Sequence, residues 1–208
     1  ISNENIWWGP GKRNSLVFTN NAAGFQHYYL KTVEPIKTYI GSFELSGVVG
    51  KLDTTKYTEI DQELLNICRP CNVFKNIDER EIDGITINYQ PKWVPNFYLG
   101  YAYSSINYAA SKDVKFEDRG EKMSIGVLMG RFIMPKDHAE FYVELGTPNQ
   151  APLPWKFFND SAKTAFTIGA RKIFPNLNRK SFLEFFVEVT QLQLLDPSKV
   201  FTPGAPYD

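Results

Sequence analysis

The sequence contains few of the residues from which most metal and nucleophilic sites are built. Among its 208 residues are two cysteines and two histidines. Cys68 and Cys71 are separated by two residues, as in half of a zinc site, but the sequence has no second pair at such a spacing. We therefore expect these thiols to lie in a loop, free or bonded to each other, and we expect neither a metal ion nor another cofactor.

Two further absences concern charge and hydrophobic length. Lysine and arginine together number 23, as do aspartate and glutamate, so the formal net charge is zero. Binding of nucleic acid requires a concentrated cationic surface, which this balance does not indicate. No apolar run reaches about 18 residues, which excludes a transmembrane helix. A transmembrane β-barrel is not excluded, because its strands alternate apolar residues with polar ones.

Recognisable catalytic motifs are also missing. Residues 9–13 are rich in glycine, but they lack the spacing of a phosphate-binding loop. No serine lies in a nucleophile elbow. The pairs Glu140/Glu144 and Glu184/Glu188 could be the acid and base of a glycosidase, but solvated charges inside a barrel are a plainer interpretation. We therefore do not expect an enzyme.

Strand-like alternation is the main pattern that the sequence does contain. In residues 38–52, apolar side chains such as Phe43 and Leu45 alternate with small or polar ones such as Ser42 and Glu44. Similar patterns predict strands at 15–21, 26–32, 36–52, 82–90, 97–105, 123–133, 139–146, 164–174 and 181–194. The sequence thus predicts an all-β protein.

Short and long connections alternate between these predicted strands. The short, proline-containing turns are 34–35, 91–96, 135–138 and 175–180. The long loops are 53–81, 106–122 and 147–163. Such alternation places all short turns at one end of an antiparallel sheet, as in outer-membrane barrels, which have periplasmic turns and extracellular loops. We therefore predict an antiparallel transmembrane β-barrel in the bacterial outer membrane, with residues 1–208 forming a single barrel domain.

Charged side chains recur on the strand face opposite the apolar one. Buried charges are tolerated only where they pair or where water enters, so they predict a wet lumen. The predicted lumen charges are Glu44, Glu140, Glu144, Arg171, Glu184 and Glu188. The strand at 123–133 does not fit this pattern, because Arg131 shares a face with Ile125, Val127 and Met129.

Two clusters have the chemistry of a sugar-binding site. Glycans are bound by flat aromatic faces surrounded by amide, carboxylate and guanidinium groups. One cluster contains Trp7, Trp8, Arg13 and Asn14, and the other contains Trp155 and Asn159 in a long loop. Either cluster could equally be part of a packed plug.

Two stretches resemble a known family. WWGPGKRNSLVFTNNAAGF (residues 7–25), followed by TYIGSFELSGVVGKL (residues 38–52), is similar to the Bacteroidetes-type branch of the Wzi capsule assembly family. Residues 89–93, the AEFYVELG strand and residues 188–191 look like later strands of that family in the same order. The first motif is the specific one, because its turn and two strand-like segments occur together.

This resemblance implies a non-enzymatic outer-membrane barrel of about 18 strands in a Gram-negative bacterium. Such a protein would bind capsular or surface polysaccharide in a lectin-like way, and its other partner would be outer-membrane lipid. The chain has about half of those strands, so we expect it to be part of a larger barrel. No oligomeric state follows from the sequence.

Two other functions remain open on the sequence alone. The chain could be a porin or channel with a charged lumen, which would conduct ions across a planar bilayer. It could also be a soluble β-sandwich that acts on glycans, which would be extracted without detergent.

Overall fold

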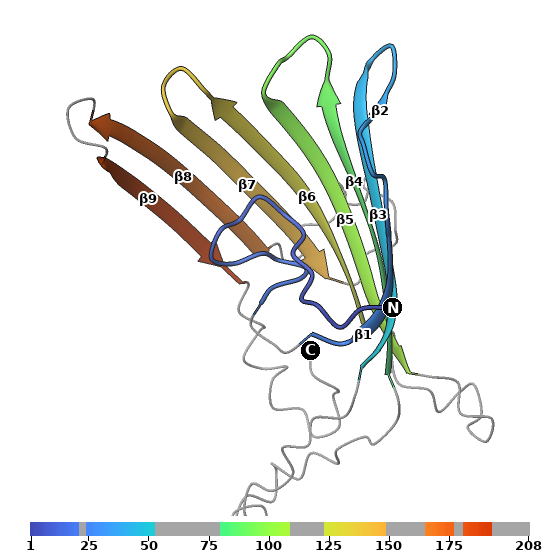
Figure 1. The fold of residues 1–208 in the computed structure, drawn as a ribbon. Coiled ribbons are helices and arrows are strands. Elements are labelled where there is room, and N and C mark those ends of the chain that lie inside the picture. The colour runs from blue at the N-terminus through green and yellow to red at the C-terminus, as the bar shows by residue number, and fades with distance from the viewer. Residues whose placement is uncertain (21–23, 53–79, 109–122, 149–164, 177–180, 193–208) are drawn as a thin grey trace, which may run out of the picture.

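The chain forms one antiparallel β-sheet (Figure 1). The computed structural model describes residues 1–20, 24–52, 80–108, 123–148, 165–176 and 181–192. The strands are β1 (Gln26–Lys31), β2 (Ile36–Lys37), β3 (Gly41–Leu52), β4 (Arg80–Pro91), β5 (Phe97–Tyr108), β6 (Met123–Met134), β7 (Ala139–Pro148), β8 (Ala165–Asn176) and β9 (Ser181–Gln191). No helix occurs within these ranges, and so none that is long and apolar enough to cross a membrane.

The sheet follows the chain from one edge to the other. Each of the strands from β3 to β8 pairs with the next one along the chain. β1 pairs with the other side of β3, and β2 extends β1 along that same side. The predicted all-β, antiparallel architecture is therefore confirmed. In the described residues β1 and β9 lie at opposite edges, so the sheet is open (Figure 1).

Two of the predicted strands differ from the structure. In the described structure, residues 15–20 are not part of the sheet, and Phe18 forms an isolated bridge with Trp8. The segment 36–52 is a hairpin and not one strand, because the chain reverses at residues 38–40 and pairs β2 with β3. The predicted turn at 34–35 was wrong: these residues separate β1 from β2 on the sheet edge, where a proline costs no ladder hydrogen bond.

The short connections lie together at one end of the sheet. They join β2 to β3, β4 to β5 and β6 to β7, and the ends of β8 and β9 that adjoin residues 177–180 lie at the same end (Figure 1). The strand ends that adjoin residues 53–79, 109–122 and 149–164 lie at the other end. The alternation predicted from the sequence is thus present in the order of the strands.

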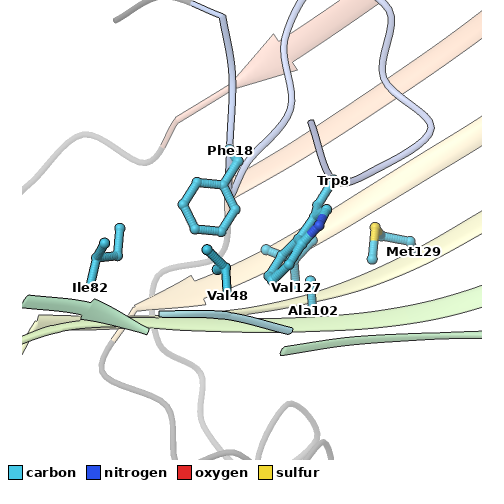
Figure 2. Packing of buried hydrophobic residues seen from close by; sticks show 7 residues of the cluster. All are labelled: Trp8, Phe18, Val48, Ile82, Ala102, Val127 and Met129. Carbon is cyan, nitrogen blue, oxygen red and sulfur yellow. The ribbon is translucent and has the colours of Figure 1, made fainter. Parts of the chain in front are cut away.

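The two faces of the sheet differ in what covers them. Residues 1–20, here called the N-terminal segment, pack against one face, which we call the inner face (Figure 2). Directly paired residues point to the same side of a sheet. One row of them crosses the inner face from strand to strand: Glu44, Asn88, Gly100, Met129, Glu144, Thr167 and Thr190. Neighbouring rows, two residues away along each strand, share this side.

Candidate functional site

The site is built on the N-terminal segment, which forms a compact turn at residues 7–15. The indole Nε1 of Trp7 donates a hydrogen bond to the carbonyl of Gly11 at 3.0 Å. The hydroxyl of Ser15 donates to the carbonyl of Trp8 and so links the two ends of the turn. Gly9 has φ of 127°, a conformation that is unfavourable for residues with a Cβ atom. The sequence therefore specifies this turn locally.

Two glutamates of the sheet hold the turn by its backbone. Glu144 accepts hydrogen bonds from the amides of Gly11 at 2.8 Å and Leu16 at 2.9 Å. Glu188 accepts from the amides of Lys12 at 2.8 Å and Asn14 at 2.9 Å. Backbone amides that face outward in a tight turn form a natural binding site for an anion. Here the anions are side chains of β7 and β9, and they bind the segment to the sheet.

An ion-pair network continues along the same face toward the short turns. Glu140 pairs with Arg131 of β6 at 2.5 Å and with Lys12 of the N-terminal segment at 3.4 Å. Arg171 pairs with Glu184 at 2.7 Å and approaches Glu140 to 4.0 Å. Arg171 thus contacts two of the glutamates that were predicted to line the lumen with it.

Trp8 lies over the middle of the inner face (Figure 2). Its ring packs with Phe18 in an edge-on contact, 4.8 Å between centroids, above Val48 and Val127. A Cβ atom on Gly84 would approach the Trp8 ring to 2.9 Å, so glycine lets the ring lie close to β4. These aromatic rings bury the apolar residues of the sheet beneath them, and together they form a small hydrophobic core.

This cover explains the anomalous strand at 123–133. Ile125, Val127 and Met129 of β6 face inward with Arg131, as their shared parity requires. They are apolar because Trp8 and the rest of the N-terminal segment pack over them, and not because they face lipid. Arg131 is the next inward residue of β6 after Met129, and it pairs with Glu140.

A cavity of about 450 Å³ lies beside Trp8 on the inner face. Its wall includes Trp7 and Trp8 from the N-terminal segment, Glu44 from β3, and Thr86 and Asn88 from β4. Tyr98 of β5 and Arg131 of β6 complete it on the far side. The cavity therefore combines aromatic rings with carboxylate, amide, hydroxyl and guanidinium groups.

Residues 3–76 match the family model of the capsule assembly protein Wzi. The resemblance predicted from residues 7–25 and 38–52 is thereby confirmed, over a little more than a third of the chain. Neither the comparison with curated proteins nor that with solved structures found a match.

This Wzi-like segment, residues 3–76, contains the turn, β1, β2 and β3. Glu144 and Glu188, which bind the turn, lie beyond it.

The structure separates the residues predicted to bind glycan. Trp7 lines the cavity, but Trp8 is only 5% exposed, and its ring is used in packing against the sheet. Arg13 and Asn14 are exposed and contribute their backbone amides to the contact with Glu188. Trp155 and Asn159 lie outside the described residues. Of the four residues in the N-terminal cluster, Trp7 and Trp8 contact the cavity.

The six predicted lumen charges lie on the inner face, in different surroundings. Glu44 is exposed in the cavity, whereas Glu144 is 1% exposed beneath the turn. Sequence alone could not distinguish these two glutamates, because the amides that surround Glu144 are 128 and 133 residues away along the chain. Thr86, Asn88 and Tyr98 were not predicted, although they lie on the inward parity of their strands.

Cys68 and Cys71 lie outside the described residues. Across the described ranges, no group of three or more histidine, cysteine, aspartate or glutamate side chains is placed to hold a metal ion.

Proposed function

We propose that this chain is part of the wall of an outer-membrane β-barrel that binds or anchors capsular or other surface polysaccharide. In this proposal the inner face lines the lumen and the outer face contacts lipid. The short turns face the periplasm, and the long connections face the outside of the cell.

The observation that carries the membrane part is the composition of the outer face. Large apolar side chains between 38% and 69% exposed occupy it from β3 to β9. They are Leu45, Val49, Ile85, Ile87, Leu99, Phe132, Phe141, Leu145, Ile168, Phe174, Leu183, Phe185, Val187 and Val189. Exposed apolar patches of more than a few hundred Å² are rare on soluble monomers. A lipid environment accounts for such a surface, and strands of 12 residues such as β3 exceed the roughly 9 to 11 needed to cross a bilayer.

The outer face becomes polar at the end where the long connections begin. Asp83 of β4 accepts hydrogen bonds from Ser105 at 2.7 Å and from Asn107 at 2.9 Å, both on β5. At the opposite end, the exposed aromatic residues Trp93 and Phe182 lie beside the short turns. Aromatic residues at the edge of an apolar band are typical of the membrane interface. These features support an apolar band on the outer face that ends before either end of the strands, as expected for a surface that crosses a bilayer.

The polysaccharide part of the proposal rests on two observations. The Wzi family model, whose description is capsule assembly, matches residues 3–76. The cavity beside that segment also has the mixed aromatic and polar lining that carbohydrate ligands require. Neither feature points to bond cleavage, so a binding or anchoring role is favoured over an enzymatic one.

Membrane fractionation and a capsule assay test the two parts together. We expect the native protein to remain in the outer-membrane fraction after a carbonate wash and to require detergent for extraction. A deletion strain should lose cell-associated polysaccharide and release it into the medium, and a plasmid copy of the gene should restore it. Recovery of the protein in the soluble fraction would indicate the β-sandwich alternative, and unchanged capsule in the deletion strain would refute the anchoring role.

A porin is less well supported by the structure. The N-terminal segment covers the middle of the inner face, where a channel would need open space. Single-channel conductance of the purified protein in a planar bilayer is therefore expected to be low.

A further inference from the structure

We propose that the cavity beside Trp8 is a binding site for a neutral pyranose unit of the polysaccharide. This inference rests on the proposed function, because it assigns a place on the inner face where that polymer is bound. The volume of about 450 Å³ lies within the range of about 300 to 1,000 Å³ typical of small-molecule sites.

Two deeply buried polar groups in the cavity wall have no hydrogen-bond partner among the described residues. Thr86 is 3% exposed and Trp8 is 5% exposed. Neither Thr86 Oγ1 nor Trp8 Nε1 makes a hydrogen bond within the described ranges. A buried polar group without a partner costs free energy, so each such group in a native structure requires an explanation. A hydroxylated ligand in the cavity would supply an acceptor for the indole N–H and a partner for the hydroxyl.

Cross-strand pairing places further hydrogen-bonding groups next to these two. Glu44 of β3 lies opposite Asn88 of β4, and Ser46 lies opposite Thr86. The side chains of Glu44 and Asn88 make no hydrogen bond or ion pair with the described residues. A carboxylate and an amide side by side can accept and donate several hydrogen bonds to adjacent sugar hydroxyls. These groups therefore match a polyhydroxylated ring better than an apolar ligand.

Aromatic residues provide the second element of a sugar site. Trp7, Tyr29 and Tyr98 line the cavity from the N-terminal segment, β1 and β5. The Trp7 nitrogen is already bonded to Gly11, which fixes the position of its ring. Rings of this kind offer apolar faces to the C–H groups of a pyranose.

The charges in the wall favour a neutral ligand. Arg131 is paired with Glu140 at 2.5 Å, so its charge is largely compensated. The other charges among the described residues of the wall are those of Glu44 and Lys31, which are opposite in sign and leave no net positive charge to attract a ligand carboxylate. A neutral hexopyranose is therefore preferred to a uronic acid.

Binding of defined sugars to the purified full-length protein in detergent micelles tests this site. The probes are the methyl glycosides of glucose, galactose and mannose, with glucuronate as the charged comparison. Saturation-transfer NMR would detect contact, and tryptophan fluorescence would give Kd. We expect at least one neutral glycoside to bind saturably and more tightly than glucuronate. Absence of saturable binding by all three glycosides, or preference for glucuronate, would overturn the proposal.

A matched pair of variants locates the binding. Thr86→Val should weaken Kd by roughly three- to tenfold, the worth of one hydrogen bond. Thr147→Val is the control, because Thr147 on β7 is equally buried, its hydroxyl also has no partner in the part of the chain that the structure describes, and it is not among the residues lining the cavity. It should leave Kd unchanged. Glu44→Gln, at an exposed position, provides a second variant that retains the fold and should also weaken binding. Equal affinity in all three variants would overturn the site.

The two proposals fail in different ways. If the deletion strain loses its capsule but no glycoside binds to the protein, the cavity assignment fails and the anchoring role stands. If the deletion strain keeps its capsule, the anchoring role fails whatever the cavity binds.

Discussion

At the scale of single residues, the glutamates of the inner face make different contacts and therefore have different roles, although they are the same type of residue. Glu144 and Glu188 bind backbone amides of the N-terminal turn, Glu140 and Glu184 pair with arginines, and Glu44 faces the cavity. A carboxylate that accepts several backbone N–H groups forms charge-assisted hydrogen bonds, which are stronger than neutral ones. The first pair therefore determines where the N-terminal segment lies.

Removal of one of these carboxylates should release the turn. In Glu144→Ala, the buried amide of Gly11 and the half-buried amide of Leu16 lose their acceptor. Each unsatisfied donor costs about 1 to 3 kcal/mol, so we expect at least a tenfold faster hydrogen exchange at both amides. Exchange measured by mass spectrometry on the protein in micelles checks this.

Glu184→Ala is the control for this experiment. It also removes an inner-face glutamate, but one whose pair with Arg171 is exposed and therefore worth at most about 1 kcal/mol. Exchange at residues 11 and 16 should stay at the wild-type rate in this variant. Equal acceleration in both variants would show that the turn is not held by Glu144.

At the scale of elements, a strand could be predicted from the sequence where its two faces differ in polarity along its whole length. In β7 and β9, glutamates recur on one face and apolar residues occupy the other, and the predicted positions of these strands agree closely with the structure. Residues 15–20 alternate similarly, but Phe18 packs against Trp8, and within the described ranges this segment pairs with no strand of the sheet. Alternation in the sequence indicates that the two sides of a segment have different environments, but it does not indicate whether a neighbouring strand is available for pairing.

One contact between elements spans three strands. Tyr142 of β7 extends over Gly169 of β8, and its hydroxyl donates a hydrogen bond to Glu188 of β9. A Cβ atom on Gly169 would overlap the Tyr142 ring. Glycine at this position thus allows the tyrosine to orient the carboxylate that binds the turn.

Gly169→Ala should therefore destabilise this part of the sheet. The added methyl group displaces a ring that is 3% exposed, and overpacking of this kind typically costs about 1 to 3 kcal/mol. Urea unfolding of the reconstituted protein, followed by tryptophan emission, should show a lower midpoint. Gly47→Ala is the matched control, because its nearest neighbour is at the ordinary distance of 3.7 Å. The explanation fails if the two substitutions shift the midpoint equally.

At the scale of the whole molecule, the sequence predicted the two faces of the sheet but not what covers the inner one. The outward residues of β3 to β9 are apolar for the length of the band, so a simple parity rule identifies them. The inward residues include both charges and the apolar group beneath Trp8. Their composition follows from contacts with a segment more than a hundred residues away from β6, which no local pattern encodes.

The assignment of the faces predicts how two adjacent positions respond to the same charge. Leu45 points to the outer face, whereas Ser46 lines the cavity. A lysine on the lipid face of a barrel costs up to about 2 to 4 kcal/mol near the middle of the bilayer, because the ammonium group must be desolvated. Leu45→Lys should therefore reduce the fraction of protein that assembles into outer membranes. Ser46→Lys, which places the same charge in a wet cavity, should assemble at nearly the wild-type level. Protease resistance of the membrane-inserted protein measures this fraction. If the protein were a soluble sandwich, neither substitution would depend on lipid, and the difference between the two variants would be the same with and without membranes.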